Sequence, residues 1–306
     1  MKSKIQYLKN KDIDVEKWDE CINHALNGRV YALSWYLDAV CQDWDAIVLE
    51  DYKAVFPLPI VRKYGLEMLI TPFMVQQLGV FSKLQLNQTV FDWMIAKIPK
   101  KFKRVHLNFN SANDYNIKGF LKSAAPNYEL NLDRDYETLH KKYNQNTKRN
   151  LKKHNIVDWQ YVVNIQPENC VQLFKENKGK WLKQDISFYQ NVIKVMHQSI
   201  HKGNGQLLGM FESNTLCACG FFVYFKNRIY NLFPASNDFG KKNGAMFGLI
   251  DKIIQENSES ESILDFEGSK IEGVARFYKG FGATERSYWT MERNELPFYW
   301  KMLMKK

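Results

Sequence analysis

The chain has 306 residues, of which 45% are hydrophobic and 25% are charged, and it contains 16 Gly and 8 Pro. This balance excludes a disordered, collagen-like or low-complexity chain, and the length suits two domains. Lys and Arg outnumber Asp and Glu by 43 to 33, a net charge of +10, which favours an anionic partner such as nucleic acid, a phosphorylated cofactor or an acidic membrane face.

The first half alternates short strands with helices. A strand at 5–8 precedes a helix with apolar residues from Val15 to Ala25, and a second helix starts at Ser34, whose hydroxyl is placed to cap it. Three strands are predicted next, at 46–49, 54–61 and 66–70. Pro57 and Pro59 indicate an edge or a bulge in the second of them. A helix at 87–98, a strand at 104–109, a short polar helix and a strand near 128–132 complete this half.

The second half repeats this order after a basic helix over roughly 136–154. A strand at 159–163 and two helices precede three strands, at 205–211, 216–225 and 228–233. A glycine-containing loop at 237–245 then opens a helix to residue 255, followed by a strand at 263–266, a helix at 273–281, a strand at 284–292 and a closing helix from 296.

Each half therefore contains a strand, two helices, three antiparallel strands, a helix, a strand, a helix and a strand. This order predicts an α/β fold with two tandem domains of the same topology, each a mixed, mostly antiparallel sheet flanked by helices. We place these domains at residues 1–133 and 134–306.

The chain shows no sign of secretion, of a membrane span or of a metal site. The first residues carry charges where a signal peptide would be apolar, and no apolar run reaches the roughly 18–20 residues of a membrane span. Five widely spaced cysteines indicate reduced thiols, and the His, Cys and acidic residues lack metal-ligand spacing. We expect a cytoplasmic protein without a bound metal or a tightly bound cofactor.

Two adjoining stretches near the C-terminus carry the strongest motif. The stretch at 274–283 reads Val-Ala-Arg-Phe-Tyr-Lys-Gly-Phe-Gly-Ala, and the preceding stretch Leu264-Asp265-Phe266-Glu267 stands in the place of a strand. This combination resembles the "A-x-x-F-Y-x-x-x-G-F" helix and fifth strand of the GNAT acyltransferase superfamily. Two such units joined by a basic helix resemble the Fem-type branch, whose members are peptidyl and aminoacyl transferases.

The resemblance implies an N-acyltransferase and gives its residues roles. Tyr278 would protonate the departing thiolate of CoA, and Glu267 or Asp265 would take the proton of the attacking amine. The residues themselves also allow simpler interpretations. Tyr278 would then be a packing residue of an amphipathic helix, and Glu267 would cap that helix or pair with Arg276.

The loop before the helix to residue 255 is the candidate donor site. GNAT enzymes have a Q/R-x-x-G-x-G/A segment here, whose backbone N–H groups hold the CoA pyrophosphate at a helix N-terminus. The corresponding residues are Lys241, Lys242, Asn243, Gly244 and Ala245. Lys241 replaces Arg or Gln, Gly244 matches, and Met246 replaces the last small residue. This departure fits the Fem-type branch, where tRNA carries the donor.

The sequence gives a weaker indication of where the acceptor binds. The matching loop of the first half, 71–80, has no basic residue, so we expect the first domain to help form the acceptor groove, with Tyr36 in its lining or in the core. In the basic helix, Lys148, Arg149 and Lys152 are candidates to hold phosphates of tRNA or of a nucleotide-linked acceptor. A solvated helix face explains the same charges.

Two functions follow. The first is transfer of an acyl or aminoacyl group from acyl-CoA or aminoacyl-tRNA to the amine of a small molecule or peptide. The alternative is a non-catalytic module of the same fold that binds an anionic nucleotide or tRNA.

Overall fold

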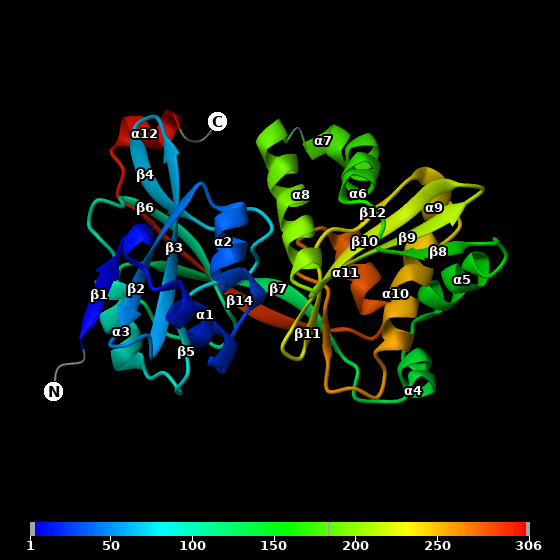
Figure 1. Cartoon of the computed structure of the whole chain (residues 1–306), viewed down its shortest axis with the longest axis horizontal. Helices are drawn as coiled ribbons and strands as arrows, with labels where there is room; N and C mark the ends of the chain where they lie inside the picture. Colours follow the sequence, from blue (N-terminus) through cyan, green and yellow to red (C-terminus); the bar gives the residue numbers. More distant parts are fainter. Residues whose placement is uncertain (1–3, 183, 304–306) are drawn as a thin grey trace. The chain divides into compact units, whose positions relative to one another are not determined.

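The computed structural model describes residues 4–182 and 184–303. The chain forms two compact units, one containing the chain up to Ala125 and again from Ser287 onwards, the other containing Pro126–Arg286. The chain passes between them within β7 (Leu121–Asn131) and β14 (Thr284–Asn294) (Figure 1). We expected one crossing, after residue 133. Two crossings occur because the last strand returns to pair with β6 (Arg104–Phe109) of unit 1.

Unit 1 is built on one mixed sheet. Its strands are β1 (Ile5–Leu8), β2 (Asp43–Leu49), β3 (Ala54–Lys63), β4 (Leu66–Ile70), β6 and β14, in this spatial order, with β5 (Phe81–Ser82) also on β3. The β4–β6 pair is parallel, whereas the other pairs are antiparallel. The helices are α1 (Val15–His24), α2 (Ser34–Val40), α3 (Gln88–Ala96) and α12 (Phe298–Leu303). Apolar side chains of α3 pack on this sheet, as Phe91 does against Phe109.

The two prolines of β3 lie where they cost the sheet little. Residues 56–59 of β3 pair with β2, whereas β5 pairs with 54–55 and β4 with 60–63. Pro57 and Pro59 therefore occupy the gap between two partners on one side of β3, where their missing N–H groups interrupt neither of those ladders. β3 therefore resembles an edge strand only at these two prolines, where one of its sides has no partner strand in the described part of the chain.

Unit 2 repeats the plan. Its strands are β7, β13 (Ile263–Asp265), β11 (Arg228–Asn231), β10 (Thr215–Phe225), β9 (Gly205–Glu212) and β8 (Gln160–Val163), in this order, with β12 (Ala235–Ser236) also on β10. Only the β11–β13 pair among these is parallel in the described residues. The structure thus confirms the expected fold class, an α/β arrangement with mixed, mostly antiparallel sheets.

The helices of unit 2 flank this sheet. They are α4 (Tyr136–Lys141), α5 (Gln145–His154), α6 (Pro167–Phe174), α7 (Lys180–Leu182), α8 (Ile186–His201), α9 (Asp238–Lys242), α10 (Ala245–Glu256) and α11 (Glu272–Lys279), with a π-helical turn at Lys175–Gly179. The core of the unit gathers α10 and α11 against the sheet, through Leu249, Ile253 and Phe281 among others.

Several local expectations were wrong. The hydroxyl of Ser34 does not cap α2, because the Asp19 carboxylate accepts hydrogen bonds from both its N–H (2.7 Å) and its Oγ (2.6 Å). The expected polar helix after β6 is a series of turns. The basic helix is two helices, since the Asn144 side chain caps α5 by accepting from Thr147 N (2.8 Å). The expected loop at 237–245 contains α9.

None of the helices within residues 4–182 and 184–303 has both the length and the apolar character needed to cross a membrane. The same residues contain no group of three or more His, Cys, Asp or Glu side chains placed to hold a metal ion.

Candidate functional site

Unit 2 contains a cavity of about 390 Å³ between α10, α11 and the chain that follows β11. Val274, Phe277 and Tyr278 line it from α11, and Met246 and Phe247 line it from α10. The remaining lining residues are polar, glycine or small apolar ones: Lys178, Asn231, Pro234, Ala235, Ser236, Gly240, Lys241, Gly244 and Gly273. The cavity therefore brings together three of the residues expected from the sequence, Tyr278, Lys241 and Gly244.

Tyr278 lies in the wall of this cavity and is 6% exposed. Its ring packs on Phe266 (4.8 Å between centroids) and on Tyr128 (6.0 Å). Burial, followed by the nearby carboxylates of Glu267 and Asp265, raises the pKa of the Tyr278 phenol well above its usual value. The phenol therefore stays protonated at physiological pH and is available as a proton donor. Tyr278 is therefore a packing residue of the core that also lines the cavity, and its role as a proton donor stays a prediction.

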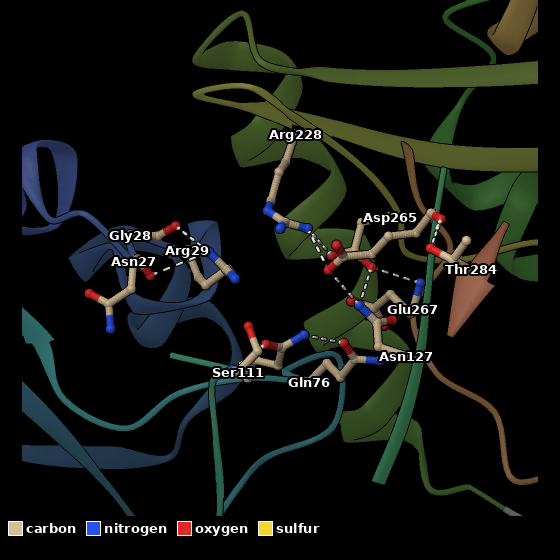
Figure 2. A network of polar contacts seen from close by, with 12 residues as sticks. Asn27, Gly28, Arg29, Gln76, Ser111, Asn127, Arg228, Asp265, Glu267 and Thr284 are labelled. Atoms are coloured by element: carbon tan, nitrogen blue, oxygen red, sulfur yellow. Dashed lines mark hydrogen bonds and ion pairs between the residues drawn. The ribbon is translucent and has the colours of Figure 1, made fainter. Parts of the chain in front are cut away.

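Asp265 is fully buried and fully engaged (Figure 2). Its Oδ2 accepts from Arg228 Nη1 (2.9 Å), and its Oδ1 accepts from Asn127 Nδ2 (3.0 Å) and from the N–H of Glu267 (3.1 Å). The same Arg228 Nη1 also donates to Glu129 Oε1 (2.9 Å). These three donors and the charge of Arg228 fix the carboxylate in place as an acceptor, so the geometry suits Asp265 as a support.

Glu267 comes two residues after Asp265, and its backbone has a φ of +60°. The sequence predicts a strand through both carboxylates, which would place these alternate residues on one face, but β13 ends at Asp265 and Glu267 lies beyond it. The left-handed backbone is unfavourable for a residue with a side chain. The bond from Glu267 N–H to Asp265 holds it in place. Glu267 is half-buried, and Arg276 pairs with Glu272 (2.6 Å) instead.

The segment 241–245 runs from the end of α9, whose last residue is Lys242, to the first residue of α10, Ala245. Gly244 has a φ of +75°, and a Cβ there would lie 2.4 Å from the backbone oxygen of Asn150 in α5, so both conformation and contact require glycine. The first backbone bond into α10 runs from Gly248 N–H to Gly244 O (3.0 Å). The N–H groups of Ala245, Met246 and Phe247 therefore lie in the open first turn of the helix.

The neighbouring residues of this segment have other surroundings. Lys241 pairs with the exposed Asp238 (2.9 Å) at the cavity rim. Asn243 donates from Nδ2 to the backbone oxygen of Phe239 (3.0 Å), and Lys242 is exposed. Neither of these two belongs to the cavity lining.

The candidate phosphate-binding residues of α5 lie outside the cavity lining. Lys148 donates to the backbone oxygen of Lys141 (3.2 Å), Arg149 donates to Asn146 Oδ1 (2.8 Å), and Lys152 is exposed. In unit 1, Tyr36 is fully buried and its hydroxyl donates to the backbone oxygen of Met74 (2.6 Å). Tyr36 therefore occupies the core of that unit, the second of its two expected places.

Two residues that line the cavity were not predicted from the sequence. Asn231 ends β11, is 2% exposed and lines the cavity. The sequence feature that could have indicated Asn231 is its position as a single amide within the apolar run Ile229–Phe233. Lys178 comes from the π-helical turn, and partial removal of its ammonium group from water, with the nearby charge of Lys241, lowers its pKa. Two such cations beside a helix N-terminus create a positive potential that favours an anion.

No protein-family model matches the chain, and no curated protein matches its sequence. Solved structures are similar to it in fold. FemX superposes with a TM-score of 0.67 over 98% of this chain and 100% of its own, at 12% identity. A tandem GNAT protein from the clavulanic acid biosynthesis pathway gives 0.57 over 96% and 99%, at 9% identity. L-PGS from Bacillus licheniformis gives 0.55 over 95% and 94%, at 8% identity. The chain therefore has a tandem GNAT-like fold, similar to that of FemX.

Proposed function

We propose that the chain is an N-acyltransferase whose donor occupies the cavity of unit 2. The observation that carries this proposal is the meeting, in one cavity, of a buried phenol, the N-terminus of α10 and two lysines. The tandem GNAT-like fold supports the same reaction class. The transferred group passes from a carrier ester or thioester to an amine.

The donor is anchored through its phosphates. The open first turn of α10 supplies backbone N–H groups and the positive end of a helix dipole, and Met246 and Phe247 of this turn line the cavity, whereas Ala245 is buried outside its lining. Lys241 and Lys178 line the same cavity and add positive charge. An acyl-CoA with its pyrophosphate at this helix end would direct its thioester along the cavity, toward the wall that holds Tyr278.

The reaction then needs one base and one acid. As the amine nitrogen attacks the carbonyl carbon, a C–N bond forms, and Glu267 takes the amine proton directly or through water. When the C–S bond breaks, the electron pair goes to sulfur and Tyr278 gives its proton to the thiolate. Asp265 supports this arrangement by holding the N–H of Glu267, and Arg228 neutralises Asp265.

An aminoacyl-tRNA donor is the second candidate. Met246 stands where GNAT enzymes have a small residue, which leaves less room for a CoA pyrophosphate. The phosphates of an acceptor stem would suit the exposed basic residues of α4, its C-cap and α5, which are Lys141, Lys142, Arg149, Lys152 and Lys153. In this version Tyr278 protonates the ribose oxygen in place of the thiolate.

The test uses acyl-CoA, a panel of primary amines and the release of free thiol. Tyr278→Phe should lower kcat by about 10²–10⁴-fold while the affinity for CoA stays unchanged, because only proton donation is removed. Tyr224→Phe is the matched control, since that hydroxyl bonds Gln206 on a neighbouring strand (3.0 Å). Full activity of Tyr278→Phe would refute the role of the phenol. Binding of CoA or of an aminoacylated RNA without turnover of either would favour the non-catalytic binding module.

A further inference from the structure

Asn231 has a carboxamide that is buried without a hydrogen bond. It is 2% exposed, and within the described residues neither its Nδ2 nor its Oδ1 has a hydrogen-bond partner. Burying an amide without satisfying either end is unfavourable, and proteins rarely do so. Asn231 also lines the cavity, so a ligand that enters the cavity is a candidate partner for the carboxamide.

The position of Asn231 is set by the sheet. The parallel ladder between β11 and β13 runs from Arg228↔Ile263 to Tyr230↔Asp265, so Asn231 is the first residue of β11 beyond it. The chain continues through Pro234, which lines the same cavity and has no N–H to offer. The cavity that Asn231 lines also has apolar wall residues, among them Phe247 and Phe277.

We infer that Asn231 is a specificity-determining residue of the donor site, which pairs with a C=O and an N–H of the donor. Its Nδ2 donates to the carbonyl oxygen, and its Oδ1 accepts from the N–H. This inference rests on the proposed function, because the ligand it describes is the acyl donor. Two donors offer this chemistry: the amides of the pantetheine arm of CoA, and the aminoacyl group at the end of a tRNA.

Such a residue would discriminate strongly between donors. A site built to bond a polar group rejects an analogue that lacks the group, because its own buried atoms are then left unpaired. A donor arm without neighbouring C=O and N–H groups leaves both polar atoms of the Asn231 carboxamide unpaired and therefore binds poorly.

The experiment compares wild type with Asn231→Leu, which keeps the number and branching of the side-chain heavy atoms, and with Asn231→Ala, which fits the same space. Asn257→Leu in unit 2 is the control, because Asn257 bonds the backbone oxygen of Ile253 (2.8 Å) at the end of α10. The melting temperature of each free protein is measured. Its affinity is measured for CoA and for an adenosine that carries an amide-linked amino acid at its 3′ position.

We expect Asn231→Leu to melt above wild type, since an unsatisfied buried amide is replaced by an apolar group, and to bind the ligand about 10–100-fold more weakly. Asn257→Leu should melt lower and bind normally. The ligand whose affinity falls identifies the source, the pantetheine arm or the aminoacyl group.

A lower melting temperature for both Asn231 variants, with unchanged affinity for both ligands, would overturn the inference and leave the proposed function intact. If the wild-type protein binds neither ligand, both the proposed function and the inference about Asn231 fail.

Discussion

Gly244 joins the candidate donor site to the basic helix α5, and its replacement by alanine tests that junction. Two separate costs arise. At a φ of +75°, a side chain costs about 1–2 kcal/mol. A Cβ at 2.4 Å from the backbone oxygen of Asn150 would also force α10 and α5 apart, and overpacking of this kind costs about 1–3 kcal/mol. Gly244→Ala should therefore lower the free energy of unfolding by about 2–5 kcal/mol.

Urea denaturation followed by circular dichroism measures this loss. With an m-value near 2 kcal/mol/M, the midpoint should fall by about 1–2.5 M. Gly203→Ala is the matched control, because Gly203 has nearly the same φ, +73°, and nothing lies within 4 Å of a Cβ there. It should show the conformational cost alone. Equal losses in the two variants would refute the contact between Gly244 and α5 as a source of stability.

Three further predictions concern unit 2. Burial lowers the pKa of His154, so as the pH falls His154 takes up a proton in the unfolded chain before it does so in the folded protein. The stability of the protein should therefore drop below about pH 6.5. In melting curves between about pH 5 and 8, His154→Phe should remove this drop, whereas His201→Phe should not. Because the pKa of Lys178 is lowered, this lysine loses its charge at a lower pH than an ordinary lysine does. The affinity for CoA, measured by calorimetry, should therefore decline as the pH rises, and it should decline less steeply in Lys178→Gln. Asp265→Ala should destabilise the unit by about 3–5 kcal/mol in urea denaturation, because Arg228 would lose its fully buried partner, and a loss below 1 kcal/mol would contradict that role.

Strands with regular apolar patterns could be predicted closely from the sequence. Residues 5–8, 66–70 and 104–109 form strands with the expected bounds, since alternation or a short apolar run leaves few other conformations. Two of the errors fall at side-chain caps. Asn144 and Asn237 each accept a hydrogen bond from a backbone N–H three residues ahead, at 2.8 Å and 2.7 Å, and so begin helices within segments that read as continuous helix or as loop.

The candidate site could be predicted only where a motif is local. Tyr278, Lys241 and Gly244 belong to short patterns and do line the cavity. Asn231 and Lys178 come from a strand end and a π-helical turn, which no local pattern places beside α11. The support given by Asp265 depends on Asn127 and Arg228, which lie 138 and 37 residues away in the chain. Such long-range contacts form only in the folded protein.

The most direct test of the central claim is the structure of this protein with a non-hydrolysable thioether analogue of an acyl-CoA. We predict the pyrophosphate at the first-turn N–H groups of α10 and the sulfur within hydrogen-bond reach of the Tyr278 hydroxyl. An analogue bound outside this cavity, or one whose sulfur lies beyond the reach of Tyr278, would contradict the account.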